Sequence, residues 1–117
     1  MAKTVMFSSL LFSGLVLLLL IANPTGAVTC SDAAQDLLPC LGYLTGGVPA
    51  PPDQCCTGAK TLNQIAAASA ADRKVLCECF KSAVKSLPIN LNKAKQIPVL
   101  CNFTPVLPID PSVDCSQ

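Results

Sequence analysis

Hydrophobic residues follow two patterns along this chain: a continuous run near the N-terminus, then helical spacing over most of the remainder. The continuous run extends from Leu10 to Ala22 after a single charge, Lys3, and it is shorter than the roughly 20 residues that span a bilayer. The segment 23–27 breaks the run with proline and glycine and provides small residues for cleavage. This order predicts a secretory signal peptide over residues 1–27, cut on one side or the other of Ala27.

The first predicted helix begins after Thr29 and carries apolar residues at helical spacing as far as Leu44. Thr29 and Asp32 have the spacing of a capping box, and Gly46 follows the last apolar residue as a stop signal. Pro39 lies inside this stretch and removes one backbone hydrogen bond, so we expect the helix to kink there.

Two longer helices are predicted after the proline-rich linker 48–52. The second helix covers about 53–67, with apolar residues on one face. The third begins at a second capping box, formed by Ser69 and Asp72, and ends before Pro88.

The last predicted helix is short, 91–96, with Asn90 as its cap and Pro98 as its stop. In the tail, 99–117, proline recurs at every third position from 105 to 111, which favours an extended course. The sequence contains no alternating strand pattern and no internal repeat. The predicted class is therefore all-α: four short helices with an irregular C-terminal tail.

All eight cysteines lie in residues 28–117, which we term the mature region. An even number of cysteines in a short chain behind a signal peptide predicts an oxidised, extracellular framework of four disulfides. The chain has no histidine and no cysteine pair at the usual zinc-ligand spacing, so we expect neither a metal nor another cofactor.

The charge balance limits the possible partners. The whole chain has 8 basic and 7 acidic residues, and one of the basic residues, Lys3, lies in the signal segment, so the mature region is formally neutral. Nucleic-acid binding and strongly cationic membrane lysis both need a surplus of positive charge that is absent here.

The cysteine order is C, C, CC, CxC, C, C, with the adjacent pair at Cys55 and Cys56. This order resembles the eight-cysteine motif of the plant non-specific lipid transfer proteins over essentially the whole mature region. The strings "CLGYLTGG", "CCTGAKTLN", "SAADR" and "INLNKA" support the resemblance. It implies a secreted, monomeric protein of the extracellular space and cell wall, with fatty acids and phospholipids as partners and transient contact with membranes.

The spacing alone leaves many disulfide pairings open. The resemblance implies the pairing of type 1 members, and type 2 members exchange the partners of the CxC cysteines and have an apolar residue between them. Glu78 occupies that position here and favours type 1. The implied pairs are Cys30–Cys79, Cys40–Cys55, Cys56–Cys101 and Cys77–Cys115.

Apolar stripes with few aromatic rings leave two possibilities, a solidly packed core or an internal apolar cavity. The resemblance favours a cavity that holds acyl chains. The residues predicted to form its wall are Leu37, Leu41, Leu44, Leu62, Ile65, Leu76, Phe80, Ala83, Val84, Leu107 and Ile109.

Two polar signatures of the family bear on the head group of a bound lipid. Arg73 in "SAADR" matches the basic residue that lies at the cavity mouth of family members, and the resemblance implies contact with head groups. The second signature, P-Y-x-I-S, is altered to "PIDPS", so its tyrosine corresponds to Ile109 or, without gaps, to Leu107. We expect an apolar wall there, and we expect Tyr43, which matches another family tyrosine, to pack within the fold.

Catalysis has little support, because histidine is absent and every cysteine is assigned to a bridge. The predicted function is the binding and transfer of fatty acids, phospholipids and galactolipids, for cutin, wax or pollen-wall deposition or for defence. The alternative on the same cysteine scaffold is an inhibitor of proteases or α-amylase, for which the exposed candidate loop is "GGVPAPPD".

Overall fold

The computed structural model describes residues 27–116, so the predicted signal peptide, apart from Ala27, lies outside the described residues. The elements are α2 (Cys30–Leu37), a 3₁₀ turn η1 (Leu38–Cys40), α3 (Leu41–Leu44), α4 (Asp53–Ala68), α5 (Ala70–Ser86) and α6 (Leu91–Leu100). Strands are absent from 27–116, which confirms the all-α class. Within this range, no helix has the length and apolar character needed to cross a bilayer.

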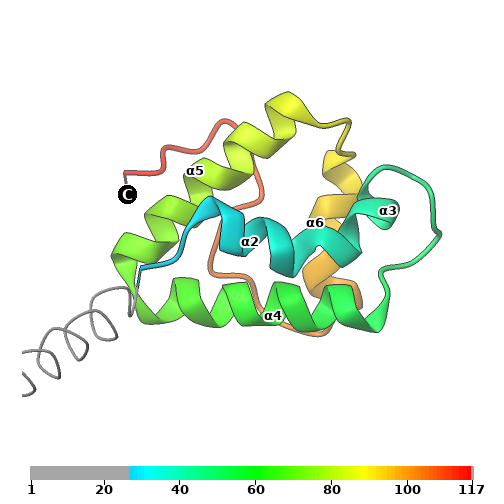
Figure 1. Ribbon diagram of the computed structural model, residues 1–117, viewed down its shortest axis with the longest axis horizontal. Coiled ribbons are helices and arrows are strands. Elements are labelled where there is room, and N and C mark those ends of the chain that lie inside the picture. Colours follow the sequence, from blue (N-terminus) through cyan, green and yellow to red (C-terminus); the bar gives the residue numbers. More distant parts are fainter. Residues whose placement is uncertain (1–26, 117) are drawn as a thin grey trace, which may run out of the picture.

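The helices enclose a central space. Helix α4 runs along one side of the molecule, α2 lies beside it, and α5 and α6 lie towards opposite ends (Figure 1). The tail after α6 returns across the fold and ends beside α5. Side chains from each of the described helices, α2 to α6, and from the tail line this interior.

The first predicted helix is divided at Pro39, as its sequence suggested. Pro39 lies in the η1 turn between α2 and α3, because a residue without an N–H cannot continue the α-helical ladder. The N-terminal capping box is complete: the Thr29 hydroxyl accepts a 3.1 Å bond from the Asp32 N–H, and the Asp32 carboxylate accepts a 3.2 Å bond from the Thr29 N–H.

The second predicted capping box is only half formed. At the start of α5 the Ser69 hydroxyl accepts a 3.2 Å bond from the Asp72 N–H. The Asp72 carboxylate does not complete the box, because it accepts a 3.1 Å hydrogen bond from the Val28 N–H, 44 residues away. The first turn of α5 is thus tied to the start of the mature region.

The prediction that Pro98 ends the last helix was wrong. Helix α6 continues through Pro98 to Leu100, and the residue that stops it is Asn102, whose φ of 60° is left-handed. The Phe103 N–H bonds the Pro98 carbonyl at 3.0 Å and the Asn102 N–H bonds the Val99 carbonyl at 3.3 Å, which is the pattern of a Schellman cap. Asparagine tolerates this conformation better than most residues, so it provides the stop.

The structure forms four disulfides, Cys30–Cys79, Cys40–Cys55, Cys56–Cys101 and Cys77–Cys115. These are the pairs that the family resemblance implied. Adjacent residues on a helix point about 100° apart, which is why Cys55 and Cys56 reach different partners. From the start of α4, Cys55 holds the η1 turn and Cys56 holds the end of α6.

Close packing between α2 and α4 depends on one glycine. Gly58 is buried in α4, and a Cβ atom at this position would overlap the carbonyl oxygen of Asp36 in α2. Only glycine permits this approach of the two backbones. The contact holds α2 against α4 along one border of the central space.

Candidate functional site

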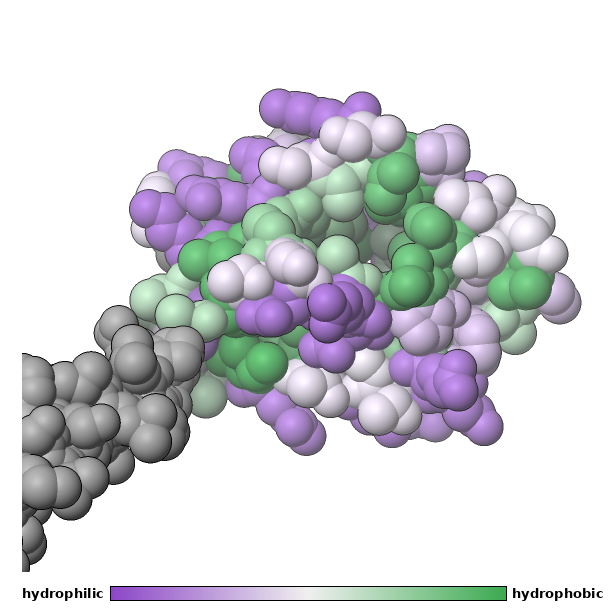
Figure 2. Space-filling view, in the orientation of Figure 1, coloured by the Kyte–Doolittle hydropathy of each residue, from purple (hydrophilic) through white to green (hydrophobic). Residues whose placement is uncertain are grey.

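The interior contains a cavity of about 460 Å³. It is lined by the inner faces of α2, η1, α3, α4, α5 and α6 and by the tail from Phe103 to Ile109. Figure 2 shows the molecule hollowed between α2–α3 and the C-terminal end of α5, with apolar residues around the opening. Its volume falls within the roughly 300–1,000 Å³ typical of small-molecule sites.

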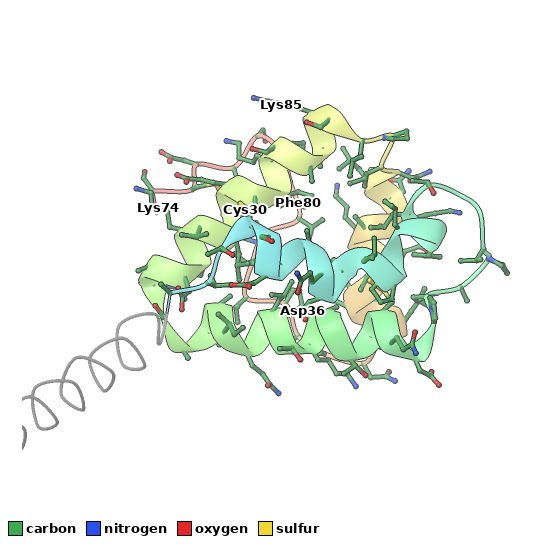
Figure 3. All side chains as sticks on the ribbon, viewed as in Figure 1. Cys30, Asp36, Lys74, Phe80 and Lys85 are labelled. Atoms are coloured by element: carbon green, nitrogen blue, oxygen red, sulfur yellow. A yellow bond between two sulfur atoms is a disulfide. The ribbon has the colours of Figure 1, made fainter. Side chains whose placement is uncertain are left out.

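Two buried clusters border this cavity and hold its wall in place. One surrounds the Cys40–Cys55 bridge and includes Tyr43 and Ile97. The other joins α2, α4 and α5 through Ala33, Leu62, Ala66 and Leu76. Phe80 packs against the first cluster and lies on the inner side of α5, while Lys74 and Lys85 of the same helix point outward (Figure 3). The side chains between the two clusters do not fill the interior, and the cavity occupies the remaining volume.

Most of the predicted wall residues lie around the cavity. The residues that line it are Leu37, Leu41, Leu44, Leu62, Leu76, Phe80, Ala83, Leu107 and Ile109. Ile65 and Val84 do not line it. Ile65 packs against the cluster of Leu62, Ala66 and Leu76 instead, and Val84 is half-buried on α5.

The wall includes residues that sequence reasoning missed. Ala94 and Ile97 reach the cavity from α6. Ile97 was missed because that helix was expected to end at residue 96, whereas Ala94 lies within the expected helix and was not assigned to the wall. Their i, i+3 spacing is a usable signal once the helix is extended. Small residues such as Ala33 and Ala59 also line the cavity, and their small side chains leave room in it.

The polar side chains in the lining are Asn63 and Ser82. The Asn63 amide is already engaged: its Nδ2 donates to the Thr104 carbonyl and its Oδ1 accepts from the Val106 N–H, both at 2.9 Å. This pair of bonds fastens the tail to α4 beside the cavity. The wall therefore presents an almost continuous hydrocarbon surface.

Leu107 and Ile109, the two candidate counterparts of the family tyrosine, both line the cavity. The tail places no phenolic hydroxyl at either position. Tyr43 does not line the cavity and is 2% exposed. Its hydroxyl donates to Gln96 Oε1 at 3.1 Å, and the Lys93 ammonium lies 5.2 Å from its ring centroid. Tyr43 therefore fastens α3 to α6.

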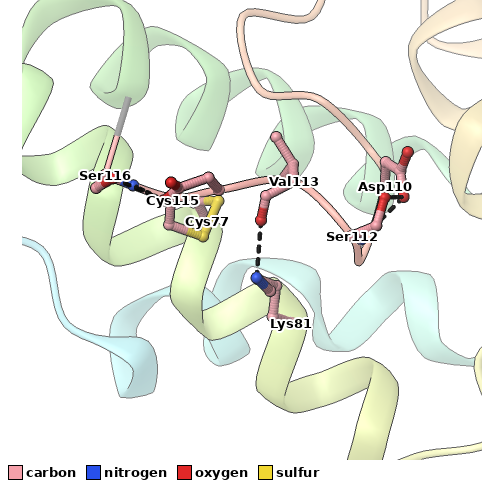
Figure 4. Close-up of a disulfide and its surroundings, with 8 residues drawn as sticks. Cys77, Lys81, Asp110, Ser112, Val113, Cys115 and Ser116 are labelled. Carbon is pink, nitrogen blue, oxygen red and sulfur yellow. Dashed lines mark hydrogen bonds between the residues drawn. A yellow bond between two sulfur atoms is a disulfide. The ribbon is translucent and has the colours of Figure 1, made fainter.

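The end of the tail is fixed to α5 (Figure 4). The Cys77–Cys115 bridge anchors it, and the Lys81 ammonium donates a 2.7 Å bond to the Val113 carbonyl.

Two acids of the tail accept hydrogen bonds that favour their ionised forms. The Ser112 backbone N–H and hydroxyl lower the pKa of Asp110. The Ser116 hydroxyl and N–H lower the pKa of Asp114 in the same way. Folding thus favours the ionised acids, and this contribution is lost as the pH falls through their folded pKa values.

Arg73 does not line the cavity. It is half-buried at the start of α5, and its Nη1 donates a 3.2 Å bond to the Ala66 carbonyl near the end of α4. This bond satisfies a carbonyl that the helix terminus leaves without an intrahelical partner. One N–H of the guanidinium is thus used within the fold.

The cavity meets solvent at an apolar rim. Leu38 and Leu87 line the cavity and are nevertheless 66% and 43% exposed. Leu38 comes from η1 and Leu87 from the turn after α5. Side chains placed in this way extend the hydrocarbon surface from the interior to the exterior.

Comparison with known proteins gives consistent results. Residues 30–115 match the model of the protease inhibitor/seed storage/LTP family. A non-specific lipid-transfer protein of Beta vulgaris is 44% identical over 104 residues, which cover 87% of each chain. The solved barley non-specific lipid transfer protein 1, in complex with lysophosphatidylcholine, superposes with a TM-score of 0.69 at 36% identity, covering 77% of this chain and 98% of that one. The wheat protein complexed with two phospholipid molecules gives 0.68 at 34% identity, over 76% and 98%.

Proposed function

Because the chain belongs to the protease inhibitor/seed storage/LTP family, and within it to the non-specific lipid-transfer proteins, we propose that it binds acyl lipids in its cavity and carries them between membranes. The observation that carries this proposal is the apolar cavity of about 460 Å³ that all the helices border. The barley and wheat relatives, solved with lysophosphatidylcholine and with phospholipid, support the ligand class. The proposed role is that of a carrier, without catalysis.

The energetics suit a ligand with a long hydrocarbon chain. Moving one methylene from water into an apolar site contributes about 0.8 kcal/mol, so a sixteen-carbon chain contributes on the order of 10 kcal/mol before the costs of association. Because Asn63 is occupied by the tail, the wall offers few free polar groups to select a head group. Binding is therefore expected to depend on chain length more than on head group.

We further propose that the exposed rim contacts membranes during transfer. Leu38 and Leu87 provide apolar surface at the opening, where an acyl chain passes between bilayer and cavity. The signal segment 1–27 supports secretion to the extracellular space and cell wall, with the folded domain formed by 28–117. Cutin, wax or pollen-wall deposition and defence are the processes that such a carrier would serve.

Filling the cavity tests this function. Ala83→Trp introduces a large ring into the lining of α5 and is expected to weaken fatty-acid binding about tenfold or more, because the ring excludes several methylenes of the ligand. Displacement of a fluorescent fatty acid measures the change. Ala67→Trp is the matched control, because Ala67 is exposed on α4 and does not line the cavity.

Two results would contradict the carrier function. One is equal fatty-acid affinity for Ala83→Trp, Ala67→Trp and the parent protein. The other is strong inhibition of trypsin or α-amylase by a protein that binds no lipid, which would favour the inhibitor alternative. In that case the exposed loop 45–52, between α3 and α4, becomes the candidate reactive segment.

We propose that Arg73 contacts the head group of acidic lipids with the guanidinium N–H groups that Ala66 does not use. Arg73→Ala is expected to weaken palmitate binding by roughly two- to fivefold, as for other partly exposed charge pairs, and to leave a neutral monoacylglycerol almost unchanged. Lys74→Ala is the control, since this neighbour is exposed. Equal losses for both lipids would assign Arg73 to the structure of the α4–α5 junction instead.

A further inference from the structure

Asp72 is a buried acid that the cavity does not use. It is 8% exposed, lies in the first turn of α5 and is not part of the cavity lining. Its Oδ1 accepts the Val28 N–H at 3.1 Å, although the two residues are 44 positions apart. Burial of a carboxylate is costly unless it is compensated by a hydrogen bond or an opposite charge. Within residues 27–116, the buried Asp72 carboxylate has only the neutral Val28 N–H as a compensating partner from outside its own helix turn.

Asp72 has two possible partners near it in the sequence, the N-cap backbone of a capping box and the Arg73 guanidinium, and its carboxylate bonds Val28 instead. In α2 the equivalent residue, Asp32, completes its capping box, whereas Asp72 directs its carboxylate to Val28. The next residue, Arg73, is a cation, but its Nη1 donates to the Ala66 carbonyl. As a backbone amide, Val28 offers Asp72 a neutral donor only.

Val28 is also fixed by packing. Its side chain packs against the buried cluster formed by Ala33, Leu62, Ala66 and Leu76. Val28 is half-buried, whereas Ala27 before it is exposed. The Val28 nitrogen is thus held at the carboxylate by its hydrogen bond and by side-chain packing, and the residue before it is exposed.

We propose that the chain is cut between Ala27 and Val28 and that the α-ammonium group formed there binds the Asp72 carboxylate. A signal peptidase, which cuts after small residues, hydrolyses the peptide bond with water. The hydroxyl of water completes the Ala27 carboxyl group and its proton goes to the Val28 amine, which takes a second proton from solvent. A cut one residue earlier would leave Val28 a neutral amide and put the charge on exposed Ala27.

This assignment gives maturation a stabilising effect. Cleavage converts a neutral hydrogen bond to Asp72 into a charge-assisted one, which is roughly twice as strong. The same ammonium group compensates the buried carboxylate at the N-terminus of α5. The precursor lacks this ion pair, so the folded state gains it only after the signal segment is removed.

The first test is the N-terminus itself. The full-length chain is expressed in a secretory host, and the secreted protein is analysed by intact mass and N-terminal peptide sequencing. A product that begins at Val28 is expected. A product that begins at Ala27, or that retains further residues, overturns the proposal.

The second test removes the charge and keeps the hydrogen-bond donor. The secreted protein is unfolded with its disulfides intact, acetylated at a pH near 6.5, where the α-amine reacts before lysine, and refolded. Acetylation is expected to raise the unfolding equilibrium constant about tenfold, because the N–H still reaches Asp72 but carries no charge. Denaturant unfolding measures the change, and mass spectrometry verifies a single acetyl group on Val28.

Substitution of the acid completes the cycle. In Asp72→Asn, acetylation is expected to change stability by less than about twofold, since the charge partner is gone. In Asp32→Asn, the matched control with an exposed acid near the same terminus, the tenfold effect of acetylation is expected to persist. An equal effect of acetylation in the parent and in Asp72→Asn overturns the ion pair, whether or not lipid binding is retained.

Discussion

Removal of the Cys56–Cys101 bridge, by alanine at both positions, is expected to destabilise the fold by about 4 kcal/mol and to release bound lipid. The bridge closes a loop with a sequence separation of 45, and loss of a cross-link of that size lowers stability by about this amount through the entropy of the unfolded chain. Thermal unfolding measures the first effect. Retention of a fluorescent fatty acid at a temperature where the variant is still folded measures the second.

The effect on lipid follows from what the bridge holds. Cys101 directly follows α6, and the chain after it supplies cavity wall from Phe103 to Ile109. Between these points the tail is held to α4 by the two hydrogen bonds of Asn63 and by packing of Leu107 against the cluster that includes Leu62. Without the bridge, the start of this wall can move away from α4, and water then reaches the hydrocarbon ligand.

The Cys77–Cys115 bridge provides the matched control. Its sequence separation is 38, so its removal is expected to lower stability by a similar amount, again about 4 kcal/mol. It anchors the tail beyond Ile109, after the last tail residue that lines the cavity. Lipid affinity is therefore expected to fall less. Equal affinity in both double variants and in the parent would show that the tail does not retain the ligand.

The starts of the helices could be predicted from the sequence, because the capping residues are local. Thr29 and Ser69 precede helices as expected, since a side-chain oxygen two or three residues before a free N–H needs no tertiary partner. The stop at Asn102 was missed, because a left-handed asparagine has no sequence signal as strong as Pro98. That one boundary also removed Ile97 from the predicted wall.

The polar contacts of the site depend on residues far apart in the chain and could not be predicted. Asn63 bonds Thr104 and Val106, and Asp72 bonds Val28, at separations of more than 40 residues. From the local sequence such residues are assigned to a helix surface or a cap, because the neighbouring residues do not indicate a partner that lies far away in the chain. The disulfide pairing is similar: spacing left it open, and the family resemblance supplied it.

Gly58→Ala is expected to be the most destabilising single substitution of a small residue in this fold, by about 3 kcal/mol. The added methyl group would overlap the Asp36 carbonyl oxygen, which belongs to the α2 backbone and cannot rotate away as a side chain can. Overpacking typically costs 1–3 kcal/mol, and a rigid neighbour places this site at about the upper end of that range. Denaturant unfolding measures the loss.

The same substitution at Gly42 separates the clash from the intrinsic effect of alanine. Gly42 lies in α3, and a Cβ atom there would meet only the Val48 side chain at 3.7 Å, an ordinary contact. Alanine favours a helix over glycine by up to about 1 kcal/mol, so Gly42→Ala is expected to be neutral or stabilising.

Because α2 forms one border of the cavity and must move to accept the methyl group, Gly58→Ala is also expected to weaken lipid binding. Equal stability of the two variants would contradict the prediction, because it would mean that the α2 and α4 backbones are not in close contact at Gly58.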